Sequence, residues 1–176
     1  MKRIGYSLFL GILLLTLQTT LLPYLPIQRI RPDMVLILIL YWGLSSAPVS
    51  GGILSFFLGY LMDLFSGNSF GLYTFSRPLL FYVAQFFKGR IYLEGFLSQF
   101  LFVFLFALFE GLLILTLLSA LNPVVLNNLY PLLFTFYAPQ SFLTGLIAPI
   151  LFFLLKKISF LLFPQYGNDI RMRERG

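Results

Sequence analysis

Three ionisable side chains lie inside otherwise apolar stretches of this sequence: Asp63, Arg77 and Glu110. A charge in a hydrocarbon environment is costly, so such residues are by default candidates for a functional site. A guanidinium can offset the charge of a buried carboxylate, and we therefore expect Arg77 to be the counter-ion of Asp63 or Glu110. Contact with a partner or ligand, or transfer of a proton, are the alternatives for these three residues.

The types of residue present argue against catalysis. The chain has no cysteine and no histidine, which removes the usual ligands of zinc and the usual base of a Ser-His-Asp triad. Asp63 and Glu110 could act as an acid and a base if they lay close together, but their positions predict different depths in the membrane. We therefore expect a protein that is not an enzyme, with no catalytic residue, no metal and no cofactor.

The composition indicates which solvent surrounds the protein. Of the 176 residues, 59% are hydrophobic and 10% are charged, whereas a soluble domain is about 45–50% apolar and about 25% charged. A domain of this length leaves a large share of its surface exposed, so it could not hide this much apolar area from water. The predicted fold class is therefore an all-α integral membrane protein.

About 20 apolar residues cross the hydrocarbon core as a helix, and the sequence predicts about six transmembrane helices. The first is expected to be a retained helix, because no small-x-small cleavage site follows it. The second and third could instead be one helix broken at Pro48. The stretch from Leu129 to Phe163 exceeds one span and contains three prolines, so we divide it into an interfacial piece at 123–138 and a last helix. The predicted domain is 1–163, with spans at 5–22, 33–44, 51–65, 70–87, 96–121 and 139–163, followed by a basic cytoplasmic tail at 164–176.

The basic residues decide between five and six spans. Cytoplasmic segments of membrane proteins are enriched in Lys and Arg, and six spans with both termini cytoplasmic leave only Arg29 and Arg31 outside. Merging the second and third helices would invert this distribution. Because the basic residues flank apolar runs, we expect them to meet lipid headgroups rather than nucleic acid. The predicted cytoplasmic residues are Lys2, Arg3, Lys88, Arg90, Lys156, Lys157, Arg171, Arg173 and Arg175.

A stripe of small residues leads to Asp63 in the third predicted helix. Gly51, Ser55, Gly59 and Asp63 recur at every fourth position and therefore share one helix face. Small residues on such a face let another backbone approach closely in membranes. The neighbour could be a helix of this chain or a helix of another protein.

The start of the second predicted helix is also informative. Pro32 suits the first position of a helix, and Asp33 in the first turn complements the helix dipole. Arg31 precedes them on the predicted outer side. We expect Arg31 and Asp33 to define the outer start of this helix. Arg29 and Arg31 could act only locally, as headgroup contacts beside Asp33, or they could form an external docking point for a partner.

These segments together resemble a known family. Arg31-Pro32-Asp33 opens an apolar run that ends in Tyr41-Trp42, and a glycine-rich helix from Gly51 to Leu64 follows. The segment Ser66-Gly67-Asn68-Ser69-Phe70-Gly71-Leu72 then closes the pattern. This order resembles MreD, the rod shape-determining membrane protein of bacteria, best over residues 29–73.

The resemblance implies a non-enzymatic scaffold in the inner membrane that belongs to the cell-elongation machinery. It implies direct binding of MreC and, in the wider assembly, MreB, RodA and a transpeptidase penicillin-binding protein, so that MreB is coupled to peptidoglycan synthesis. The family's fold is similar to the six-helix substrate-binding component of energy-coupling-factor transporters. A small-molecule-binding subunit of a transporter is therefore the alternative function, although fold similarity does not itself show a ligand.

Overall fold

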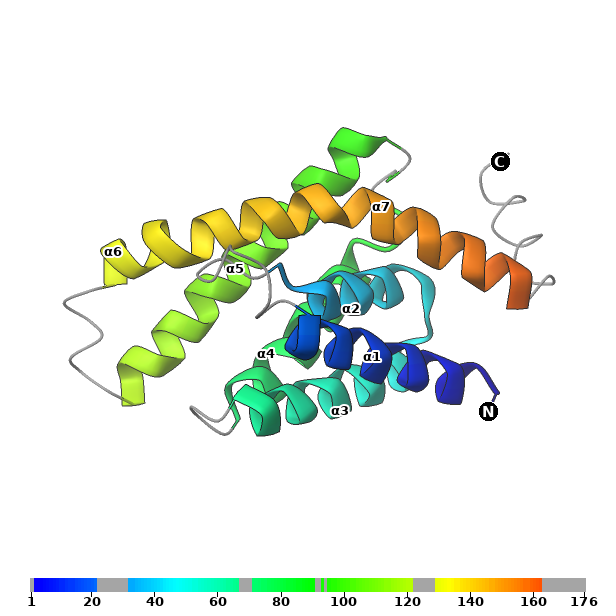
Figure 1. The fold of residues 1–176 in the computed structure, drawn as a ribbon, viewed down its shortest axis with the longest axis horizontal. Helices are drawn as coiled ribbons and strands as arrows, with labels where there is room; N and C mark the ends of the chain where they lie inside the picture. Colours follow the sequence, from blue (N-terminus) through cyan, green and yellow to red (C-terminus); the bar gives the residue numbers. More distant parts are fainter. Residues whose placement is uncertain are drawn as a thin grey trace.

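The computed structural model describes residues 2–21, 32–66, 71–90, 93, 95–121 and 129–162, and the secondary structure of this part of the chain is helical. Figure 1 shows the helices packed side by side as a bundle, with α2 near its centre. The elements are α1 (Lys2–Leu21), α2 (Met34–Ser45), α3 (Pro48–Ser66), α4 (Leu72–Phe86), α5 (Phe96–Leu121), α6 (Leu129–Leu132), the π-helical turn η3 (Leu133–Tyr137) and α7 (Ala138–Leu162).

The second and third predicted helices are separate, so the alternative of a single helix broken at Pro48 is wrong. Helix α2 ends at Ser45, and the N–H of Ser46 still donates to the carbonyl of Trp42 at 2.7 Å. Pro48 is the first residue of α3, where its missing N–H removes no helical hydrogen bond. The chain therefore reverses between α2 and α3 within two residues (Figure 1).

Helix α2 is short and enclosed by the rest of the bundle. Its 12 residues correspond to about 18 Å at 1.5 Å per residue, which is less than the hydrocarbon core of about 30 Å. Every side chain from Val35 to Leu40 is buried, and α2 packs against α1, α3, α4, α5 and α7. A helix that is apolar on all sides is typical of such a central position.

Helix α2 divides the buried apolar side chains into two groups. Leu36, Ile37 and Leu40 pack with residues of α4, α5 and α7. On the other side of the same helix, Leu38 and Trp42 pack with residues of α1 and α3. Because α2 contributes to both groups, it joins the α1–α3 side of the bundle to the α5–α7 side.

The break that we expected between an interfacial piece and the last helix is absent from residues 129–162. These residues are helical throughout, through α6, η3 and α7. The N–H of Ala138 bonds to the carbonyl of Leu133, five residues earlier, directly before Pro139, which has no N–H to donate. A π-type turn accommodates this proline, and Pro149 also lies inside α7, so the prolines do not divide the helix. Residues 122–128 lie outside the described part of the chain.

Within the described ranges, three helical segments are long and apolar enough to cross a membrane by length and composition: Pro48–Phe65, Phe96–Ala120 and Leu133–Ser159. The segments Leu8–Thr20 and Met34–Ser45 are apolar but shorter. The structure therefore supports a membrane-spanning helical protein, while the number of six spans stays a prediction.

Helices α3 and α4 pack closely against each other, and the small residues of α3 explain how. A Cβ atom on Gly59 would lie 2.4 Å from the carbonyl oxygen of Tyr73, and one on Gly51 would lie 2.2 Å from the ring of Phe81. Ser55, between them on this face, is fully buried, and its hydroxyl donates to the carbonyl of Gly52 at 2.8 Å. The neighbour of this face is therefore α4 of the same chain.

We expect Gly59→Ala to lower the thermal stability of the purified protein. The added methyl group would meet backbone atoms of α4, which cannot move aside as a flexible side chain can, and such overpacking costs about 1–3 kcal/mol. Gly5→Ala is the matched control, because a Cβ atom there meets no heavy atom within 4 Å. Thermal unfolding in detergent would measure both, and equal melting temperatures for the two variants would contradict the close approach of α3 and α4.

Candidate functional site

A buried charge cluster lies where α2, α4, α5 and α7 meet; we call Asp33, Arg77, Glu110, Ser76 and Thr144 the Arg77 cluster. Arg77 of α4 is fully buried, and its Nη2 donates to a carboxylate oxygen of Asp33. Its Nε lies 3.1 Å from Oε1 of Glu110, which α5 contributes. One guanidinium therefore serves two buried carboxylates.

Asp33 holds two further contacts in the Arg77 cluster. Its Oδ1 accepts a hydrogen bond of 2.9 Å from the N–H of Leu36, which caps the N-terminus of α2 as Asp commonly does. Its own N–H donates to the hydroxyl of Thr144 at 3.1 Å, and that hydroxyl donates to the carbonyl of Gln140 at 2.7 Å. Asp33 therefore connects the start of α2 to both Arg77 and α7.

Glu110 has a different set of neighbours. The hydroxyl of Ser76 donates to its Oε1 at 3.3 Å, and this is the same oxygen that faces Nε of Arg77. The ring of Tyr73 lies 5.4 Å from the guanidinium carbon of Arg77, a distance at which a cation and a π-system attract. Tyr137 of η3 packs over the adjacent Gly111.

Asp63 lies outside the Arg77 cluster and has another role. Its carboxylate accepts hydrogen bonds from the N–H groups of Gly71, Tyr73 and Thr74 at 3.0, 3.0 and 2.8 Å, and from the hydroxyl of Thr74. The first N–H groups of a helix have no partner within the helix, so Asp63 of α3 caps the N-terminus of α4. A negative charge there also complements the dipole of α4.

We expected Arg77 to be the counter-ion of Asp63 or Glu110. It pairs with Glu110 and not with Asp63. The carboxylate of Asp63 is occupied by the start of α4, and Asp33 takes the place that we assigned to Asp63 as a possible partner of Arg77. Asp33 was expected only at the start of the second helix, and it performs that role as well. Arg31 lies outside the described residues.

Sequence reasoning did not identify Ser76, Thr144 or Tyr73 as members of this site. Ser76 could have been predicted, because it directly precedes Arg77. A hydroxyl beside a buried arginine can donate a hydrogen bond to the carboxyl group that pairs with that arginine. Thr144 lies 111 residues from Asp33, and nothing in the local sequence links the two. Among the described residues, no group of three His, Cys, Asp or Glu side chains could hold a metal ion.

The comparison with protein families decides the assignment. The model of the family described as rod shape-determining protein MreD matches residues 1–161. The chain belongs to the MreD family. No curated protein and no solved structure matches it.

Membership in the MreD family implies a role in the determination of rod shape, in a family of shape-determining proteins rather than a known enzyme family. The matched range contains both the Arg77 cluster and Asp63. The internal ion pairs of this MreD-family protein join helices that are distant in sequence.

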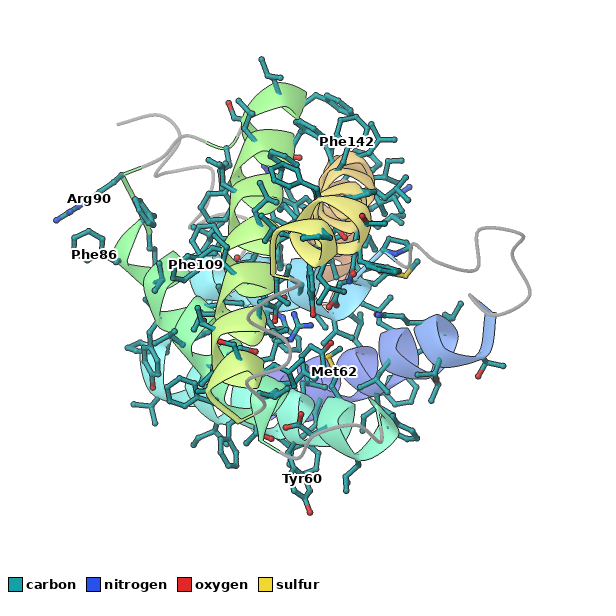
Figure 2. The ribbon with its side chains drawn as sticks, turned by 90° about the vertical axis from the view of Figure 1, so that its left-hand side faces the viewer. Tyr60, Met62, Phe86, Arg90, Phe109 and Phe142 are labelled. Carbon is teal, nitrogen blue, oxygen red and sulfur yellow. The ribbon has the colours of Figure 1, made fainter. Side chains whose placement is uncertain are left out.

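Replacing Arg77 by methionine should strongly destabilise the MreD-family bundle. The variant would leave Asp33 and Glu110 buried without their shared cation, and loss of one partner of a buried pair costs about 3–5 kcal/mol. Arg90→Met is the matched control: Arg90 is exposed and stacks over the ring of Phe86 at 4.5 Å, at the margin of the bundle (Figure 2). Thermal unfolding in detergent would measure both variants. A melting temperature equal to that of the wild type in both would contradict a structural role for Arg77.

At Asp63, alanine should destabilise the protein more than asparagine does. Alanine removes both oxygens that accept from the start of α4, whereas the single amide oxygen of asparagine can replace only one of them. Each buried donor left without a partner costs about 1–3 kcal/mol. Melting temperatures in the order wild type, Asp63→Asn, Asp63→Ala would support the capping role, and wild-type stability of Asp63→Ala would refute it.

Proposed function

We propose that this protein is a non-enzymatic scaffold in the bacterial inner membrane that binds MreC and helps to couple MreB to peptidoglycan synthesis. The match to the MreD family over residues 1–161 carries this proposal. RodA and a transpeptidase penicillin-binding protein belong to the proposed wider assembly, and lipids surround the bundle. The proposal is consistent with a bundle whose charged residues bind one another across helices.

The arrangement of the helices supports a topology with both termini cytoplasmic. The start of α1, the turn between α2 and α3, and the end of α7 lie at the same end of the bundle (Figure 1). Lys156 and Lys157 lie near this end of α7, and Lys88 and Arg90 follow α4. We assign this end to the cytoplasm because basic residues favour the cytoplasmic side. The similarity to transporter substrate-binding components stays a prediction.

The exposed faces of the bundle limit where a partner helix could bind. Helix α2 is mostly buried, so it offers little surface. The outer helices carry large exposed apolar side chains, among them Tyr60 of α3 and Phe142 of α7 (Figure 2). We therefore place the contact with MreC on the outer faces of the helices that surround α2.

A binding experiment can test the proposal directly. The chain has no cysteine, so single cysteines can be introduced without removing native ones. Ile53, Leu105 and Ile150 lie on the exposed faces of α3, α5 and α7, and Leu38 of α2 is fully buried. Tagged protein in native membranes would be cross-linked, purified and analysed by mass spectrometry.

We expect MreC to be recovered with the protein, and cross-links to it from one of the exposed positions but not from Leu38→Cys. Recovery without MreC would contradict the proposed scaffold. A defined small molecule in place of any protein partner would favour the transporter subunit, which needs polar groups that converge on a cavity. Reporter fusions after Gly176 that prove external would contradict the topology.

A further inference from the structure

The Arg77 cluster contains more acidic than basic groups. Two carboxyl groups, Asp33 and Glu110, share one guanidinium, and each of the three side chains is at most 7% exposed. If both carboxyl groups were ionised, the described part of the cluster would carry a net charge of −1. An uncompensated charge at such a buried position is strongly disfavoured, and a carboxyl group there binds a proton instead.

The contacts distinguish the two carboxyl groups. Asp33 accepts a hydrogen bond from Nη2 of Arg77 and another from the N–H of Leu36, at the N-terminus of α2. These two donors occupy both carboxyl oxygens of Asp33, and a helix N-terminus favours a negative charge beside it. Glu110 makes an ion-pair contact with Nε of Arg77, but the geometry there does not form a hydrogen bond. Only Ser76 donates to its Oε1 among the described residues.

The other titratable groups that face Glu110 supply no second positive charge. Arg77 and Tyr73 face it from α4, Asp33 from α2, and Tyr137 from η3. Tyrosines are neutral near pH 7, and Thr144 of α7 is uncharged. The described surroundings of Glu110 therefore contain one cation, which Asp33 already binds.

We propose that the Arg77 cluster is a binding site for one proton, which Glu110 holds as a carboxylic acid while Asp33 and Arg77 form the ionised pair. The proton comes from water, and its binding converts the Glu110 carboxylate into the acid and makes the cluster neutral. Its release would leave two carboxylates to compete for Arg77. Because these residues belong to α2, α4 and α5, proton release weakens the junction of these helices. This proposal does not depend on MreC binding.

Infrared spectroscopy of the full chain in a sugar-headgroup detergent, which contains no carbonyl group, tests this site. A protonated carboxyl group has a carbonyl stretching band that is separate from the amide bands and shifts in D2O. The chain has only six Asp and Glu residues, so few carboxyl groups can contribute to this band, and a carboxyl group in water is ionised at pH 7 because its pKa lies near 4. We therefore expect one protonated carboxyl band in the wild-type protein at pH 7.

Three variants assign this band. Glu110→Gln should abolish it, and glutamine resembles the protonated acid in shape, so the bundle should still fold. Asp33→Asn leaves Glu110 in place but removes its competitor for Arg77, so Glu110 should ionise and the band should again be lost at pH 7; asparagine can still cap α2. Asp63→Asn should retain the band, because Asp63 makes no contact with the cluster and asparagine keeps one oxygen that can accept from the start of α4.

Several results would overturn the proposal. Absence of the band from wild-type protein at pH 7 would show that both carboxyl groups are ionised, and saturable binding of sodium ions by such protein would identify a metal ion as the compensating charge. Persistence of the band in Glu110→Gln, or in Asp33→Asn at pH 7, would place the proton elsewhere. The wild-type spectrum decides the matter even if a variant does not fold.

Discussion

The burial of one guanidinium is the constraint on which the bundle depends. Arg77 has no exposed surface, and a charged group can occupy such a place only with partners that replace its lost hydration. Those partners come from α2 and α5, and α7 joins through the contact between Thr144 and the backbone of Asp33. In a membrane, apolar burial gives little preference for one arrangement of helices over another, so these directional contacts define which helices meet.

The position of Arg77 is itself fixed by contacts at both ends of α4. At the start, Asp63 of α3 binds three backbone N–H groups. At the other end, Gln85 and Lys88 donate to the carbonyl of Ser46, which follows α2, at 3.0 and 2.7 Å. The absence of a side chain at Gly59 lets the backbones of α3 and α4 approach between these ends. Asp63 therefore acts on the Arg77 cluster through the placement of α4 rather than through direct contact.

The sequence predicts the existence of this polar centre better than its connections. Three charged residues in apolar runs implied that each has a buried partner. Gly51, Ser55 and Gly59 recur at every fourth position, and this spacing predicted a close contact with another helix. Of the two partners of Arg77, the sequence predicted Glu110 but not Asp33. Asp33 was not considered because its position at the start of a helix already explained it. A capping residue has two carboxylate oxygens, and sequence gives no indication that the second one reaches a helix 44 residues later.

The last helical stretch shows a different limit. Three prolines in residues 129–163 were expected to interrupt it, because proline removes a hydrogen bond from a helix interior. The structure instead accommodates Pro139 by a local π-type turn, in which Tyr137 packs against Gly111 of α5. Glycine at 111 leaves space for that ring beside Glu110. The turn therefore brings a tyrosine next to the Arg77 cluster, a juxtaposition that no local pattern encodes.

The distribution of polar groups also determines how this protein can recognise others within the membrane. Its intramembrane charges bind each other or the backbone of a neighbouring helix, and the outward faces of α3, α5 and α7 carry large apolar side chains. A partner helix that packs on these faces gains no net hydrophobic energy over lipid, so its affinity must come from close packing and shape. Close packing requires a rigid surface. In the proposed binding of a partner helix, the contacts inside the bundle would therefore act indirectly, because they hold the outer helices in one arrangement.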